Sequence, residues 1–581
     1  MPRIGPKLVA AALLLSGARV VAEEAPGEYR GFWVDTFNTA WNTHADAVAI
    51  VGNAVAARAN ALFVQVRRRG DSWYLKSLEP PPDGVPIQPG FDPLDDLIVE
   101  AHGRGIEVHA FVVVGSIWNQ TLPPSSPSHV FNRHGFNQAA GAFYPGRDNW
   151  LTRTLLPDGS ATSMQGYRFG TSFFLDLGHP EAAAYTVDVL MQLVRNYDLD
   201  GIHLDYIRYP DISVSGQTPA TGASVGYNET SVARYQRRHG IPEGSPPPSP
   251  GDSLWSQWRR DQVTQFVRRL YLNAVAEKPG MKMSAALICF GGGPVAEGEW
   301  AFAEAYWRVF QDWRAWTEEG TLDLAIPMVY KTEHTASGRA AFDQWNEWTR
   351  NHQYGRAAAL GLGIYLNSVE GTLLQARRAL SASATGRRAA GVNFFSMAVT
   401  NAAVAGNPLS LPAGQDTPLR PFSEFAAGLT TGRSADGARP YEDAAANPVP
   451  LFPAPAAVAE MPWKSSPAAG HLMGFILDET GAAVDSGVVT ILRVDPATAP
   501  GAGRTSVSVA TDGQGFYGGV DLAPGNYSVT VTAPARPPFR PARTVAVAAG
   551  RVSRFDFALE NPQRMKIERP ARALPAPRPV R

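Results

Sequence analysis

The stretch "GIHLDYIRYP", at positions 201–210, places His203 and Asp205 among strand-forming residues. Side chains alternate along a strand, so these two groups share one face. A carboxyl group in a buried strand must be paired or hydrogen-bonded, or its pKa must rise. Arg208 follows closely and could hold Asp205 ionised or bind an anionic group of a substrate. Asp205 is therefore either an acid–base catalyst or a paired structural acid.

Cleavage of a glycosidic bond generally needs two carboxyl groups, one as acid and one as base or nucleophile. Asp205 is the first candidate, and Glu333 in "YKTEH" is its expected catalytic partner. Asp35 and Asp71 compete with Glu333 for the second role. Aromatic residues near the same strand ends could stack on sugar rings, although each could instead be a core residue. They are Trp33, Trp73, Trp118, Tyr206 and Tyr330.

Other chemistries find less support in the sequence. No cluster of His and Cys has zinc-ligand spacing, and no Gly-x-Ser-x-Gly motif marks a serine hydrolase. We therefore expect no metal and no cofactor. Cys289 is the only cysteine, so no intramolecular disulfide can form, and its apolar neighbours predict a buried side chain.

Eight short apolar runs alternate with helical patterns between residues 29 and 400, which predicts an α/β fold. Right-handed crossovers close eight such repeats most simply into a (β/α)8 TIM barrel. A doubly wound open sheet is the alternative, but no Gly-rich phosphate loop follows the first strand. The expected strands are 29–36, 61–68, 106–114, 201–209, 281–290, 322–330, 358–366 and 391–398.

Two connections, 115–172 and 211–251, are too long for ordinary loops, and both leave the C-terminal ends of predicted strands. Long loops at that face usually build the wall of an active site. Disordered decoration is the alternative for the Pro-rich segment 242–251. Beside the catalytic pair Asp205 and Glu333, we expect a substrate-binding set at this face: Asp35, Arg67, Asp71, Trp73, Trp118, Tyr206, Arg208, Tyr330 and Asn367.

The remaining organisation follows from changes in composition. Residues 1–22 predict a signal peptide, with an apolar run too short to span a bilayer. We therefore expect a secreted or periplasmic protein without a membrane anchor. The barrel should occupy residues 28–402, followed by a Pro/Ala-rich linker at 403–469. Short strands with Gly-rich turns at 470–560 predict a small all-β sandwich. The Pro-rich, basic composition of residues 561–581 predicts a disordered tail.

The charge is nearly balanced: the formal net charge is −1 and the pI is about 6.9. Loss of Arg3, Lys7 and Arg19 with the signal peptide would give −1 − 3 = −4. Nothing supplies the positive field that nucleic-acid binding requires. We expect a monomer whose partner is a polysaccharide or glycan strand.

Five sequence blocks together resemble the glycosyl-hydrolase-like family 10 of bacteria. They are "EYRGFWVDTFN", "NALFVQVRRRGDSWY", "FDPLDDLIVEAHGRGIEVHAF", "DGIHLDYIRYP" and "WRRDQVTQFVRRLY". The resemblance spans about residues 28–400. It implies a TIM barrel that hydrolyses an exported polysaccharide, in some members the glycan strands of peptidoglycan. It also implies that Arg67, Asp71, Asp205 and Arg208 lie in the cleft.

The chain departs from that family where many members carry a second acid after the position of Asp205, since Tyr206 stands there. Lys331 likewise replaces an aromatic residue. The region 470–560 resembles carboxypeptidase regulatory-like domains, which implies a spacer or adhesion unit. A catalytically inactive carbohydrate-binding or scaffold protein on the same barrel remains the alternative to a glycoside hydrolase.

Overall fold

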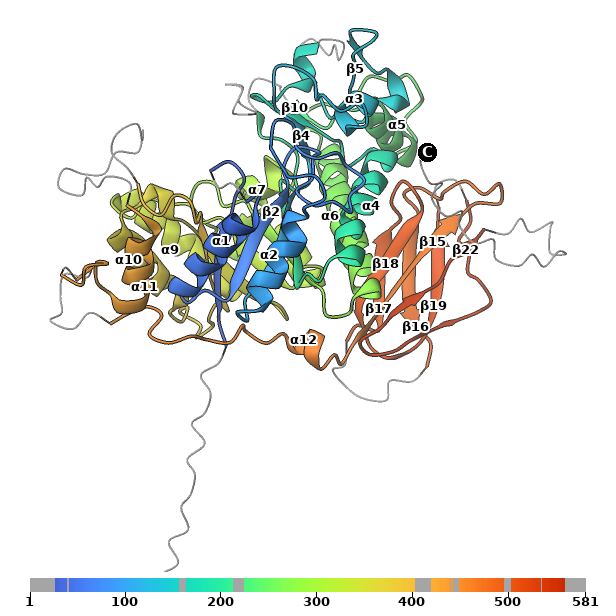
Figure 1. The fold of residues 1–581 in the computed structure, drawn as a ribbon. Coiled ribbons are helices and arrows are strands. Elements are labelled where there is room, and N and C mark those ends of the chain that lie inside the picture. Colours follow the sequence, from blue (N-terminus) through green and yellow to red (C-terminus); the bar gives the residue numbers. More distant parts are fainter. Residues whose placement is uncertain are drawn as a thin grey trace, which may run out of the picture.

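The computed structural model describes residues 27–38, 41–155, 164–212, 224–402, 420–438, 440–441, 449–495, 503–533 and 536–559. The predicted signal peptide and basic tail lie outside these ranges. Figure 1 shows two bodies, a barrel with its helices and a β-sandwich beside it. No helix in the described ranges is both long and apolar enough to cross a membrane.

Eight parallel strands close into a barrel in the order β1-β14-β13-β12-β11-β9-β3-β2, which confirms the predicted fold class. All eight predicted strands are present, but several end earlier than expected. The strand β9, for example, stops at Asp205, because Tyr206 takes a left-handed backbone conformation with φ 50° that no strand can continue. The strands are β1 (Tyr29–Val34), β2 (Ala61–Arg67), β3 (Glu107–Val113), β9 (Gly201–Asp205), β11 (Lys282–Leu287), β12 (Leu324–Pro327), β13 (Ala357–Gly363) and β14 (Gly391–Phe395).

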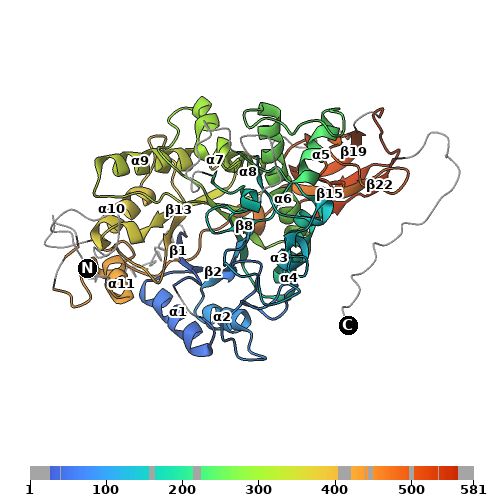
Figure 2. The ribbon, with the colours of Figure 1, turned by 90° about the horizontal axis from the view of Figure 1, so that it is seen from above.

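Helices cover the outside of the strands, and the view from above shows them as a ring (Figure 2). Their apolar faces pack on outward side chains of the strands. They are α1 (His44–Ala56), α2 (Pro93–His102), α4 (Pro180–Asn196), α6 (Ser253–Glu277), α8 (Trp313–Glu319), α9 (Ala336–Asn351), α10 (Val369–Leu380) and α11 (Phe422–Thr431).

The last of these helices, α11, lies within the segment 403–469 that composition predicted to be a linker. Its Phe425 ring packs against Phe394 on β14 and Phe32 on β1, with centroids 5.3 and 6.1 Å apart. Phe452, further along the segment, also belongs to the buried core. The described part of this segment therefore completes the outer layer of the barrel.

Inside the barrel, aromatic rings surround a buried histidine. The indole Nε1 of Trp33 donates to Nε2 of His203 at 2.9 Å, and Nδ1 of His203 lies 2.9 Å from the Ser284 hydroxyl. Because an indole N–H can only donate, Nε2 accepts and Nδ1 carries the proton. Burial and the nearby His109 lower the pKa of His203 well below its usual value, so it stays neutral.

The two long loops fold over the carboxyl ends of the strands. The first contains the antiparallel β4–β8 pair (Ser116–Trp118 with Phe173–Phe174), α3 (Val130–His134) and the β5–β6 pair (Phe136–Asn137 with Ala142–Phe143). The loops join where β7 (Thr154–Leu155) pairs with β10 (Ser224–Val225), just before α5 (Glu229–Arg238). This subdomain stands above the barrel in Figure 1.

The C-terminal domain is the predicted sandwich of two four-stranded sheets. Its interior holds apolar side chains from both sheets, among them Leu472, Tyr517 and Val529. One sheet contains β15 (Gly470–Leu477), β18 (Phe516–Leu522), β21 (Val552–Arg554) and β22 (Phe557–Ala558). The other contains β16 (Val488–Arg493), β17 (Ser506–Ala510), β19 (Gly525–Thr532) and β20 (Val545–Val547).

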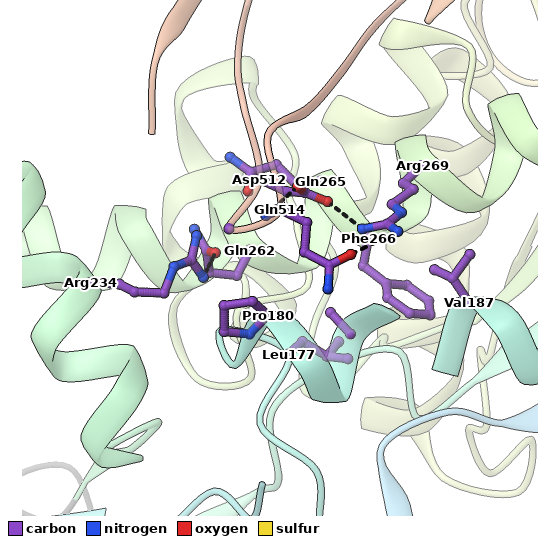
Figure 3. Close-up of a pocket in the computed structure, with 12 residues that line it drawn as sticks. Leu177, Pro180, Val187, Arg234, Gln262, Gln265, Phe266, Arg269, Asp512 and Gln514 are labelled. Carbon is purple, nitrogen blue, oxygen red and sulfur yellow. Dashed lines mark hydrogen bonds and ion pairs between the residues drawn. The ribbon is translucent and has the colours of Figure 1, made fainter. Parts of the chain in front are cut away.

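The sandwich is docked on α5 of the loop subdomain and on the barrel helix α6 through buried arginines (Figure 3). Arg234 on α5 donates from Nε and Nη2 to the Asp485 carboxylate, both at 2.7 Å. Arg269 on α6 pairs with Asp512 at 2.8 Å. Gly518 on β18 lies so close to Leu272 that a side chain there would collide with it. The domain is thus a packed part of the molecule.

Asp485→Asn should destabilise the whole protein by about 3 kcal/mol, because the buried Arg234 guanidinium would lose its counter-charge. Calorimetric unfolding measures the loss. The matched control Glu277→Gln removes the exposed pair with Arg195 and should change stability by no more than about 1 kcal/mol. Equal, small effects of both variants would show that the interface contributes little.

Candidate active site

Asp205 lies at the mouth of the barrel, where β9 ends. Its Oδ1 accepts the backbone N–H of Tyr206 at 2.7 Å, a contact made possible by the left-handed turn at Tyr206. No described group hydrogen-bonds its Oδ2, and the residue is partly exposed. Burial raises the pKa of Asp205 to about 6, against the opposing effects of Arg208 and the Tyr206 N–H. A carboxyl with this pKa can both give and take a proton near neutral pH.

Tyr206 and Arg208 flank this carboxyl group. The Arg208 guanidinium lies over the Tyr206 ring, 4.6 Å from its centroid, and Nη1 donates to the Tyr209 carbonyl at 3.3 Å. It forms no direct ion pair with Asp205, so it acts on that group through its field alone. The Nε of Arg208 is buried and has no hydrogen-bond acceptor among the described residues.

Two further carboxyl groups lie at neighbouring strand ends. Asp35 follows β1, is fully buried, and accepts the N–H groups of Phe37 and Asn38 at Oδ1. Its Oδ2 has no hydrogen-bond partner in the described ranges. Asp71 follows β2; burial raises its pKa, and Arg69 opposes this from 3.5 Å. The Oδ2 of Asp71 also has no described hydrogen-bond partner, but unlike that of Asp35 it forms an ion pair with Arg69.

The positions of Asp35 and Asp205 can be compared through the interior hydrogen bond between Trp33 and His203. Each aspartate lies two residues beyond one partner of that bond, so each occupies the same face in the next layer towards the mouth. Tyr330 is close to both: burial raises the pKa of its phenol, and so do the carboxylates of Asp205 and Asp35. Both acids therefore lie near Tyr330, beyond the Trp33–His203 pair.

Aromatic rings line the side of the mouth formed by β12 to β14. Tyr330 packs on Trp33, Tyr365 and Phe395, with centroids 6.3, 6.0 and 5.7 Å apart. Tyr330 and Tyr365 are partly exposed. Such faces can stack on sugar rings.

The structure places Glu333 away from this space. Its carboxylate forms a bidentate pair with Arg378 of α10, at 2.9 and 2.6 Å. Its backbone N–H donates to Asn367 Oδ1, and Asn367 Nδ2 donates to the Lys331 carbonyl. Glu333 and Asn367 therefore fix the loop after β12, and neither offers a free polar group to the mouth.

Three other expected binding residues are buried beneath the surface. Arg67 is fully buried and pairs with Glu79 at 2.6 and 2.7 Å. Trp73 belongs to the outer core between strands and helices. Trp118 is also mostly buried, with Arg69 over its ring at 5.2 Å.

Arg68 reaches the mouth although the sequence drew attention to Arg67. A bulge in β2 between Gln65 and Arg67 shifts the register against β3. No residue type in this stretch predicts the bulge. The Arg68 guanidinium lies 4.1 Å from the centre of the exposed Phe37 ring, and its Nε is buried without a described acceptor. Burial and the neighbouring Arg69 lower the pKa of Arg68, against the opposing effects of Asp71 and Asp35. Arg68 and Arg208 thus present two cationic groups at the same opening.

No three of His, Cys, Asp and Glu gather closely enough to hold a metal ion within the ranges that the structure describes. The chemistry available at the mouth is that of carboxyl groups, guanidinium groups and aromatic faces.

The chain is similar in sequence to curated proteins of two bacteria. The chain is 24% identical to glycosyl hydrolase YngK of Bacillus subtilis over 314 residues, which cover 52% of each chain. It is 25% identical to glycosyl hydrolase DigH of Escherichia coli over 287 residues, 47% of this chain and 54% of that protein. The chain thus spans about half the length of these curated relatives.

Among solved structures, the PgaB (BpsB) glycoside hydrolase domain of Bordetella bronchiseptica is similar over 64% of this chain and 95% of that one. Its identity is 14% and its TM-score 0.42, too low to support an inference. Residues 471–560 match the carboxypeptidase regulatory-like domain, as expected. The Glycosyl hydrolase-like 10 model matches residues 28–378, and the chain belongs to this family.

Proposed function

We propose that this protein is a glycoside hydrolase that cleaves glycosidic bonds of a polysaccharide, with Asp205 as the proton donor. The observation that carries the proposal is the raised pKa of Asp205, about 6, on a partly exposed carboxyl group at the barrel mouth. A carboxyl group with a pKa of about 6 stays partly protonated near neutral pH and can protonate the departing sugar oxygen. Membership of the glycosyl hydrolase-like family supports the same reaction class.

The second carboxyl group in this proposal is Asp35. Glu333 has both carboxylate oxygens engaged by Arg378, and Asp71 faces the guanidinium of Arg69. Asp35 keeps Oδ2 without a described partner and shares a layer with Asp205. As a carboxylate, Asp35 would activate a water molecule or stabilise positive charge on the sugar ring.

The substrate we propose is an exported glycan, with peptidoglycan glycan strands as the first candidate. The family resemblance and the predicted signal peptide support this choice. Arg68 and Arg208 add a physical reason, because neither guanidinium group has a carboxylate partner among the described residues, and such groups favour a substrate that carries anionic groups. Tyr330 and Tyr365 would stack on its sugar rings.

Asp205→Asn should lower the release of reducing ends from purified glycan strands by about 100-fold or more, because Asn cannot donate the proton. The substrate panel includes peptidoglycan strands and neutral polysaccharides. For the wild type, kcat/KM should fall as pH rises through about 6, since the donor loses its proton there. Binding of the strands by both proteins with no product from either would identify a carbohydrate-binding scaffold and overturn the proposal.

Asp35→Asn and Glu333→Gln separate the two candidates for the second carboxyl group. Asp35→Asn should cost about 100-fold in activity and leave strand binding intact. Glu333→Gln should keep activity within a few fold but destabilise the protein by about 1–3 kcal/mol, because it breaks the pair with Arg378. The reverse result, with Glu333→Gln inactive and Asp35→Asn active, would restore Glu333 as the partner.

A further inference from the structure

A second cavity lies in the subdomain formed by the loop after β3. Its volume is about 460 Å³, within the range of small-molecule sites. Its wall consists mainly of rings from five short elements, with Arg168 at the rim: Trp118, Phe131, Phe136, Phe143 and Phe173. We refer to it as the aromatic cavity.

The rings of the aromatic cavity hold one another in place. Phe131 packs on Phe173 at 4.8 Å, and Phe143 lies 5.4 Å from Phe136 and 6.0 Å from Phe173, all between centroids. The Trp118 indole N–H donates to the Leu122 carbonyl at 2.8 Å, so the indole presents only carbon to the cavity. The wall is preformed and apolar.

The aromatic cavity is separate from the space around Asp205. Phe173 and Phe174 are neighbours on β8, so their side chains point to opposite faces. Phe174 packs towards Tyr206, with centroids 5.9 Å apart, whereas Phe173 lines the cavity. The antiparallel β4–β8 pair therefore divides the barrel mouth from the cavity.

The lining is a poor match for a sugar and a good match for an apolar group. A buried sugar hydroxyl without a partner is costly, and the polar side chains around the cavity are Gln120, Thr121 and Arg168. Arg168 is exposed, lies 5.8 Å from the Phe173 ring centre and donates Nε to the Thr171 carbonyl. No carboxylate pairs with it in the described part of the chain.

We propose that the aromatic cavity binds an amphipathic anion, with its apolar part among the rings and its acidic end at Arg168. At roughly 30 Å³ for each water-sized group, the cavity holds an apolar chain or ring system of about ten to fifteen heavy atoms. A free fatty acid and an acidic glycan that carries an acyl chain share this chemistry. This site does not depend on the proposed hydrolase activity.

Isothermal titration of the full chain with decanoate tests the proposal, and decanol serves as the uncharged analogue. Wild type should bind one decanoate saturably. Phe173→Ser, which opens the wall, and Phe143→Trp, which fills the cavity, should each weaken binding at least about tenfold. Arg168→Gln should weaken decanoate binding about five- to tenfold and leave decanol unchanged. Leu492→Ser, at an exposed apolar residue of the sandwich, is the matched control and should bind as wild type.

Absence of saturable decanoate binding, or equal binding by wild type and the folded Phe143→Trp variant, would overturn the site. If Arg168→Gln changed the binding of decanol and decanoate equally, the proposal that Arg168 binds the acidic end of the ligand would be overturned. A further arm compares decanoate with an O-acylated acidic oligosaccharide and its deacylated form: tighter binding of the acylated form identifies a glycan source, and tighter decanoate binding a free acid. Asp205→Asn should bind decanoate normally, which separates this result from the hydrolase proposal.

Discussion

The site depends on the hydrogen bond that Trp33 donates to His203 across the barrel interior. It joins two inward-facing columns of side chains, one on β1 and one on β9, at a histidine whose pKa is lowered by burial and by His109. Asp35 and Asp205 are the next residues in those columns. Asp205 therefore rests on a layer with no cation beneath it, and burial raises its pKa without help from a second acid.

Several contacts hold in place the loops around this layer of side chains. The loops after β3 and β9 meet in the β7–β10 pair, and Asp176 ties them to α5 through Ser231 at 2.9 Å. Arg234 then connects α5 to Asp485 of the C-terminal sandwich. Gly115, at the base of the first loop, fits only because it has no side chain, since a Cβ would lie 2.9 Å from the Tyr206 carbonyl oxygen. The C-terminal sandwich thus supports the wall of the mouth, although its sequence resemblance alone implies a spacer or adhesion unit.

Much of the fold could be predicted from periodicity, because strands buried on both faces must be apolar whatever lies around them. Strand alternation also predicts that His203 is interior and that Asp205 lies one layer above it. The roles of Arg67 and Glu333 could not be predicted, because their partners, Glu79 and Arg378, become neighbours only in the folded chain. Arg68 depends on a bulge, and α11 follows a stretch whose composition resembles a linker. Local pattern thus specified the barrel, and long-range pairing decided which polar residues remain free.

The central claim is that the barrel holds Asp205 as a protonatable carboxyl group near neutral pH. Carbon-13 NMR titration of aspartate side-chain carboxyls, with Asp205→Asn to assign the resonance, measures this directly. The account predicts an Asp205 carboxyl that titrates at about 6, well above the ordinary 3.8. Titration of that carboxyl near 3.8 would contradict the account, because the group would then be an ionised structural acid with no proton to give.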